Sequence, residues 1–169
     1  MVHDPEVQDL LDKDQIHDLA MRYCRGIDRG DGEIIGSVFH GDATVDYGMF
    51  VGTVADFVPF ILANIRTFER VSHNVSNEFV LVDGGKAWAE YYVVAYSCAD
   101  LDGQLTDAMI GGRYLDRLDK RDGVWKIAHR QFVMDWNQNA PSTAEWDEGM
   151  YGELRVRGTQ GKDDPVYSL

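Results

Sequence analysis

The chain has 169 residues, of which 44% are hydrophobic and 27% charged, and its formal net charge is −13. These proportions are typical of a single globular domain with a core of useful size. The negative charge argues against nucleic acid and membrane as partners, since both would repel such a surface. It leaves a small neutral ligand as a possible partner.

The two cysteines, Cys24 and Cys98, lie in unrelated contexts without metal-ligand spacing. This argues against a disulfide framework or a zinc site. The amino-terminal segment is acidic, and no apolar run is long enough to span a bilayer. Phosphate loops, nucleophile elbows and metal clusters have no match in the sequence. We therefore expect a cytoplasmic protein that uses no metal and no cofactor.

Helical periodicity dominates the first 68 residues. Asp4 and Pro5 form a helix start signal, and an apolar stripe at helical spacing runs to the glycines of "IDRGDG". Residues 33–39 and 54–68 are predicted as two further helices. Residues 43–52, between them, are predicted as a strand and turn.

After residue 70 the period of the apolar residues changes to two. Four strands are predicted, over 70–82, 86–98, 108–118 and 124–136, joined by turns at "DGG" and "DKRDG". Gly111 and Gly112 inside a strand predict a bulge that bends the sheet. Helices followed by a long bent antiparallel sheet indicate an α+β fold with the helices on one face.

The end of the chain follows neither period. We expect residues 1–136 to form the domain and residues 137–169 to form its carboxyl-terminal arm or lid. In the strand over 86–98, both faces carry apolar side chains. Because one face of the sheet is expected to pack on the helices, the other needs a cover. We therefore expect a homodimer or a homotrimer.

His73 stands out within its strand. Strand side chains alternate between faces, so it shares one face with Val71, Val75, Asn77, Phe79 and Leu81, four of which are apolar. Either its ring is satisfied by neighbours in the core, or a pocket opens there and uses a proton carrier.

Two residues of the first helix are candidates to lie beside such a pocket. Asp28 is at the carboxyl end, where the helix dipole disfavours negative charge, so it is either a turn-forming residue or an inward-pointing partner for a cation or a donor. Tyr23 lies on the apolar stripe, where it either fills volume or offers its hydroxyl to a leaving oxygen.

The last predicted strand holds a further candidate, Arg130. Alternation places it on one face with Phe132, Met134 and Trp136, at a cavity wall or at the exposed rim. His129 falls on the other face and is interpreted as structural. A histidine oriented by an aspartate is a competent general base near neutral pH.

The segments "LAMRYCRGIDRGD", "SVFHGDATVDYG", "SHNVSN" and "GRYLDRLDKRDGVWKIAHR" together resemble the SnoaL-like branch of the NTF2-like superfamily. The resemblance covers about residues 10 to 136. It implies a cone in which a curved antiparallel sheet wraps around the amino-terminal helices and an apolar pocket. The fold hosts dehydratases, isomerases, cyclases, epoxide hydrolases and catalytically silent subunits, so it does not fix the function.

The resemblance also implies roles for single residues. Cofactor-independent lyases of this branch, of the scytalone dehydratase, bile acid 7α-dehydratase and hexachlorocyclohexane dehydrochlorinase types, carry an aspartate and a histidine where Asp28 and His73 stand. Arg130 matches a pocket arginine of the latter two types. Tyr23 matches a tyrosine of the bile acid type, where the dehydrochlorinase has a lysine, which argues against halide elimination.

The sequence therefore predicts a dehydratase-like lyase that acts on a hydroxylated cyclic or aromatic molecule. Asp28 would orient His73, which would remove a proton, while Arg130 would stabilise the developing charge and Tyr23 would protonate the leaving group. The expected substrate-binding residues are Tyr92, Tyr96, Asn77, Phe132, Met134 and Trp136. Retro-aldol cleavage or isomerisation would use the same base. The remaining alternative is a non-catalytic ligand-binding or structural subunit.

Overall fold

A computed structural model describes residues 4–168 of the chain. It begins with helix α1 (Pro5–Arg29), where the Asp4 side chain accepts a hydrogen bond from the backbone N–H of Glu6. The helix ends at Gly30, which adopts the left-handed conformation with φ of 62°. The predicted start and end of the first helix are thus confirmed.

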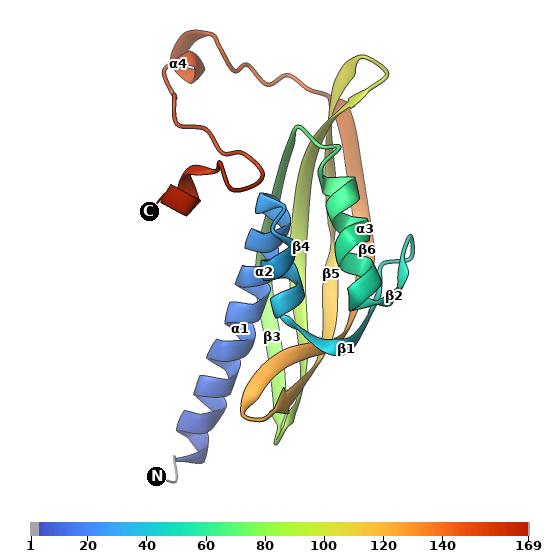
Figure 1. The fold of residues 1–169 in the computed structure, drawn as a ribbon, viewed down its shortest axis with the longest axis vertical. Helices are drawn as coiled ribbons and strands as arrows, with labels where there is room; N and C mark the ends of the chain where they lie inside the picture. The colour runs from blue at the N-terminus through green and yellow to red at the C-terminus, as the bar shows by residue number, and fades with distance from the viewer. Residues whose placement is uncertain (1–3, 169) are drawn as a thin grey trace.

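Short elements connect α1 to the main sheet. They are α2 (Gly32–Ser37), β1 (Phe39–Asp46), β2 (Val51–Thr53) and α3 (Val54–Ile65). The Asp31 side chain caps α2 by accepting from the N–H groups of Glu33 and Ile34. As Figure 1 shows, α2 lies beside the upper part of α1, and α3 lies beyond α2 on the same side of the sheet.

Four long strands follow: β3 (Arg70–Asp83), β4 (Lys86–Leu101), β5 (Gln104–Arg121) and β6 (Val124–Pro141). The six-stranded sheet has the order β2-β1-β6-β5-β4-β3, and its neighbours are antiparallel except for the parallel pair of β1 and β6. The predicted α+β class is confirmed. β3 forms one edge of the sheet, so one side of its backbone has no neighbouring strand.

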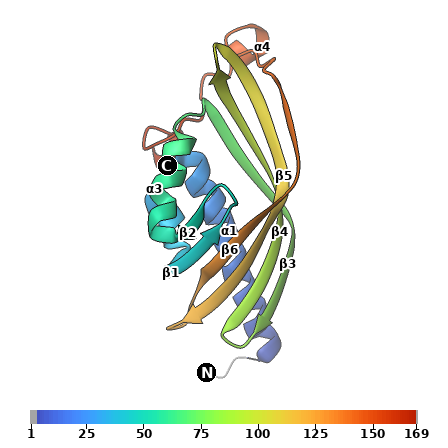
Figure 2. The same cartoon turned by 90° about the vertical axis from the view of Figure 1, so that its right-hand side faces the viewer.

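The sheet curves around the helices, as Figure 2 shows. The core fills the space between them, and its largest fully buried side chains include Ile16, Tyr23, Ile35, Phe39, Phe57, Tyr91, Trp125, Arg130 and Leu118. A bulge lies at the two glycines, because the pairing of β5 with β6 shifts between Gly111 and Gly112, but its extra residue is Asp135 in β6. This residue moves Trp136 to the outer face, so Trp136 does not share the predicted face with Arg130. A Cβ atom on Gly111 would lie 2.0 Å from the Trp136 indole, so only glycine admits that ring there.

A second bulge, in β3, corrects the predicted face of this strand. The pairing of β3 with β4 shifts between Ser76 and Phe79, and Asn77 has a positive φ of 46°. Because the bulge inserts an extra residue, the alternation is inverted beyond it. His73 therefore lies on the inner face, whereas Phe79 and Leu81 lie exposed on the outer face.

A third shift, in β6, changes which residues of the strand share a face with Arg130. The pairing with β5 skips a residue between His129 and Ile127. Trp125 and Ile127 thus share the inner face with Arg130, which is fully buried, whereas strict alternation along β6 would place them on the opposite face. His129 lies on the outer face, where its Nδ1 is 2.8 Å from the Thr44 hydroxyl.

The chain after β6, residues 142–168, is called the arm here. It leaves the sheet in a wide loop with a short helix, α4 (Gly149–Gly152), and returns to the carboxyl end of α1 (Figure 1). It ends in a 3-10 helix, Pro165–Ser168. Within residues 4–168, no helix combines the length and apolar character needed to cross a membrane.

Candidate functional site

The Asp28 carboxylate and the His73 side chain meet between the end of α1 and the edge strand β3. The Nδ1 atom of His73 lies 2.8 Å from Oδ1 of Asp28. The second carboxylate oxygen, Oδ2, accepts the backbone N–H of the same histidine at 3.1 Å. Asp28 therefore holds both the ring and the main chain of His73.

The edge position of β3 explains the second contact. The N–H of His73 has no strand to pair with on that side, and a buried N–H without a partner is costly. Asp28 satisfies it from the neighbouring helix. The side chains of Asp28 and His73 remain 16% and 13% exposed, so the pair is sheltered but can be reached.

The geometry assigns the tautomer of His73. An ionised carboxylate only accepts hydrogen bonds, so Nδ1 carries the proton that points to Asp28. The other ring nitrogen, Nε2, is then an acceptor, and no residue in the described range 4–168 hydrogen-bonds to it. This arrangement can accept a proton from a bound molecule, with Asp28 stabilising the imidazolium that results.

A pair of tyrosine hydroxyls lies deeper on the same side of the sheet. The hydroxyl of Tyr23 is 2.6 Å from that of Tyr47. Burial raises the pKa of Tyr23 well above its usual value of 10, and the neighbouring Tyr47 and Tyr114 raise it further. Both phenols therefore stay protonated at neutral pH, and one of the two protons is left to be donated elsewhere.

Tyr47 was missed by the sequence reasoning. It follows β1, and its ring stacks between Phe57, at 4.9 Å between ring centroids, and Phe132, at 5.7 Å. A single aromatic residue in a turn carries no periodic signal. Only its position in the segment "VDYG", one of those that carry the family resemblance, could have identified it.

Arg130 lies in the core with a carboxylate of its own. Its guanidinium donates to both oxygens of Asp116, at 2.7 and 2.6 Å, and both side chains are essentially inaccessible. Burial alone would lower the pKa of Arg130, but the charge of Asp116 outweighs it and the pKa is raised. The guanidinium also lies 4.2 Å from the ring centroid of Tyr23 and 4.3 Å from that of Tyr114.

One nitrogen of this arginine stands out. Nη1 of Arg130 is buried and has no hydrogen-bond partner among residues 4–168. Buried donors are nearly always satisfied, so an unsatisfied one calls for an acceptor such as a water or a ligand oxygen. The arginine thus combines a structural ion pair with one free donor beside the tyrosines.

Cys24 is a free, buried cysteine of α1. It lies one turn before Asp28, and burial raises the pKa of its thiol to about 12, while Arg130 lowers that pKa and Asp28 raises it. A thiol with so high a pKa is not a nucleophile at neutral pH.

The expected substrate-binding residues are divided between the two faces of the sheet. Phe132 packs in the aromatic cluster with Tyr47, and Met134 pairs with Gly112 on the inner face. Tyr92, Tyr96 and Trp136 lie on the outer face. Asn77 is exposed at the bulge. The structure therefore brings Phe132 and Met134 to the side of His73 and does not bring the other four there.

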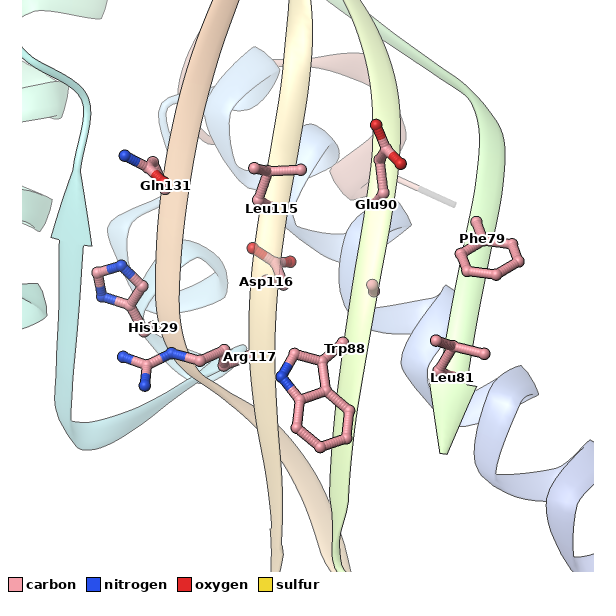
Figure 3. Close-up of a pocket in the computed structure, with 10 residues that line it drawn as sticks. Phe79, Leu81, Trp88, Glu90, Leu115, Asp116, Arg117, His129 and Gln131 are labelled. Carbon is pink, nitrogen blue, oxygen red and sulfur yellow. The ribbon is translucent and has the colours of Figure 1, made fainter. Parts of the chain in front are cut away.

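The outer face of the sheet has a hollow of its own, of about 410 Å³. Figure 3 shows Phe79, Leu81 and Trp88 on one side of it and His129 and Gln131 on the other. It is separated from the Asp28–His73 pair by the sheet itself. Within the described range, no three His, Cys, Asp or Glu side chains gather as metal ligands would.

Comparison with known proteins identifies the family. The SnoaL-like domain matches residues 8–131, which include Asp28, His73 and Arg130. The chain belongs to the SnoaL-like domain family. Its resemblance to the NTF2-like superfamily is confirmed, and a solved structure with a cystatin-like fold is among its neighbours. No curated protein matches the chain.

Several solved structures are similar to this SnoaL-like domain. A putative scytalone dehydratase from Novosphingobium aromaticivorans is 25% identical, with a TM-score of 0.69 over 80% of this chain and 92% of its own. A Mycobacterium tuberculosis protein of unknown function is 28% identical, with a TM-score of 0.65 over 75% and 77% of the two chains. A hexachlorocyclohexane dehydrochlorinase from Novosphingobium barchaimii, 19% identical with a TM-score of 0.69 over 80% and 94%, shows the shared fold alone.

Proposed function

We propose that the protein is a cofactor-independent lyase that removes water from a hydroxylated cyclic or aromatic molecule. The observation that carries the proposal is the 2.8 Å contact of His73 Nδ1 with Asp28, which leaves Nε2 without a partner in the described range. The similarity to a putative scytalone dehydratase supports an elimination reaction.

In this proposal Nε2 of His73 takes a proton from a substrate carbon, or from a phenolic oxygen conjugated to it. The electron pair released forms the new double bond, and the carbon–oxygen bond to the hydroxyl breaks. Tyr23, whose hydroxyl lies 2.6 Å from that of Tyr47, donates a proton to the departing oxygen, so that water leaves. Nη1 of Arg130 offers a hydrogen bond to the oxygen on which negative charge develops.

The surroundings of the tyrosines favour an apolar ring as substrate. Tyr47, Phe57, Phe132 and Tyr114 form a continuous aromatic wall. Such walls with a few convergent polar groups are typical of small-molecule sites. Both cysteines are free and buried, so the fold needs no disulfide, which supports our proposal that the protein works in the cytoplasm.

The test is an ultraviolet absorbance scan of hydroxylated aromatics, lignin-like diols and hydroxysteroids without added cofactor. A conjugated product should grow with the wild type and fail to grow with His73→Ala. His129→Ala is the matched control, because this histidine lies on the outer face and should leave the activity unchanged. Equal product from the wild type and His73→Ala would remove His73 as the base.

The same panel separates the alternatives. Release of an aldehyde instead of water would indicate retro-aldol cleavage by the same base, and a product of unchanged mass would indicate an isomerase. Ligand binding without turnover, at equal affinity for the wild type and His73→Ala, would favour the non-catalytic subunit.

A further inference from the structure

The positive charge of Arg130 is matched inside the domain by the carboxylate of Asp116. These residues are register partners on β6 and β5, and the two carboxylate oxygens accept hydrogen bonds from Nε and Nη2 of the arginine. The two side chains are 0% and 1% exposed, so water screens neither charge. Because the pair as a whole is neutral, Asp116 cancels the charge that Arg130 would otherwise present to a bound molecule.

The rings around the guanidinium add hydrogen-bonding groups but no charge. Those of Tyr23 and Tyr114 have their centroids 4.2 and 4.3 Å from it. Burial raises the pKa of both phenols well above 10, and it raises the pKa of Tyr47 as well. All three phenols therefore stay protonated and uncharged at neutral pH, and the balance of the ion pair is undisturbed.

Nη1 of Arg130, which is buried without a partner in the described range, is the donor left for a bound molecule. A carbonyl or phenol oxygen needs only such a donor to replace its bond to water. A carboxylate or phosphate also needs a positive charge to offset the cost of leaving water, and Asp116 already takes that of Arg130. The ion pair therefore favours a neutral oxygen at Nη1 over an anionic one.

We propose that Asp116 is a specificity-determining residue that restricts the site to uncharged molecules. With Asp116 in place, Nη1 of Arg130 binds a carbonyl or phenol oxygen and rejects a carboxylate or phosphate. The inference rests on the proposed function, in which this nitrogen faces the substrate oxygen. It narrows the substrate class to hydroxylated rings that carry a ketone or phenol group and lack a carboxylate or phosphate.

Benzamide and benzoate provide the test, because they have nearly the same shape and only benzoate is charged at neutral pH. In calorimetric titration, the wild type should bind benzamide more tightly than benzoate by about tenfold or more, since a buried carboxylate without a counter-ion is costly. Asp116→Asn keeps an acceptor oxygen for the guanidinium and removes the negative charge. It should reverse the preference, because the charge of Arg130 is then free to pair with benzoate.

Asp122→Asn is the matched control. Asp122 is exposed in the turn between β5 and β6, and its positive φ of 52° is one that asparagine tolerates. This change removes one negative charge, as Asp116→Asn does, but it should leave the preference for benzamide as in the wild type.

A wild type that binds benzoate as tightly as benzamide would overturn the proposal, and so would binding of neither probe. An unchanged preference in Asp116→Asn would do the same. If circular dichroism shows that this variant does not fold, Arg130→Met combined with Asp116→Leu replaces it. Loss of the Nη1 donor should weaken benzamide binding by about tenfold, and an unchanged affinity would contradict the proposal.

The binding measurement is independent of turnover, so the two proposals can fail separately. Selective binding of benzamide without turnover of any hydroxylated aromatic, diol or steroid would remove the lyase and keep the role of Asp116. Turnover together with equal binding of both probes would keep the lyase and remove that role.

Discussion

Asp28 binds His73 through both of its carboxylate oxygens, one at the imidazole Nδ1 and one at the backbone N–H. In Asp28→Asn, the single amide oxygen can still accept the backbone N–H of His73. The amide NH2 group then faces Nδ1 and can only donate to it. The wrong tautomer of His73 is then favoured. We expect Asp28→Asn to lower kcat by orders of magnitude, up to about 10⁴ as in histidines that lose an orienting carboxylate.

The same variant should change the stability only slightly, because the buried N–H keeps its acceptor. Urea unfolding measured beside kcat separates the two effects. A fall in kcat that matches the loss of folded protein would contradict an orienting role for Asp28.

Arg130 and Asp116 form a buried ion pair, so single substitutions act mainly on folding. Arg130→Met leaves the carboxylate of Asp116 buried and uncompensated. We expect a loss of about 3–5 kcal/mol in the free energy of unfolding, as for other broken buried pairs. Arg130→Met combined with Asp116→Leu should recover much of this loss.

The double variant also isolates the chemical role of Arg130. If the guanidinium stabilises charge on the substrate, the double variant should recover its stability but still form product slowly in the absorbance assay. Full activity of that variant would show that the arginine serves the fold alone.

The hydroxyl pair of Tyr23 and Tyr47 predicts unequal effects of removing each oxygen. Tyr23 is the proposed donor to the leaving group, so Tyr23→Phe should reduce kcat by about 10²–10⁴, the usual contribution of a general acid. Tyr47→Phe should reduce it less, since Tyr23 keeps its proton. Tyr91→Phe is the control, because within residues 4–168 that hydroxyl donates to the carbonyl of Ile16 alone. Equal losses for both pair members would assign the donation to the pair as a unit.

The arm predicts a pH-dependent contribution to stability. Asp31 accepts hydrogen bonds from Lys162 and from the Tyr167 hydroxyl, both at 2.8 Å. The hydrogen bond from Lys162 lowers the pKa of Asp31 from 3.8 to about 2, against a smaller opposing effect of burial. The stabilisation is therefore complete above pH 3.8 and is lost as the pH falls through about 2.

Urea unfolding at several pH values checks this expectation with Asp31→Asn, which keeps a cap for α2 but loses the ion pair. The wild type should be more stable than the variant at pH 6, and the difference should shrink towards pH 2.5. A difference that stays constant with pH would argue that Lys162 contributes nothing to the attachment of the arm.

Local patterns were enough to predict most of the elements. The apolar stripe and Gly30 bound α1, and the alternation after residue 70 revealed four strands, because both signals depend on neighbours in the sequence. The faces beyond a bulge could not be predicted this way. An extra residue at Asn77 or near Ala128 is visible only once the partner strand and its register are known.

In the candidate site, too, local sequence patterns identified single residues but not their partners. Asp28 and His73 are 45 residues apart, and their pairing was expected from the family resemblance, not from spacing. The ion pair of Arg130 was missed because Asp116 lies 14 residues earlier, on the neighbouring strand. Contacts between residues far apart in the sequence depend on tertiary packing, and the periodicity of apolar residues does not reveal them.

The hydrogen bond from the His73 main chain to Asp28 has a consequence for how the protein behaves in concentrated solution. β3 is an edge strand, and edges with free N–H groups can recruit strands from other molecules into aggregates. Asp28 occupies one of these groups and places a negative charge beside it. Asp28→Ala removes both this protection of the edge strand and the hydrogen-bond partner of the imidazole. His73→Ala removes the imidazole alone, so the backbone N–H keeps its acceptor and the edge stays protected.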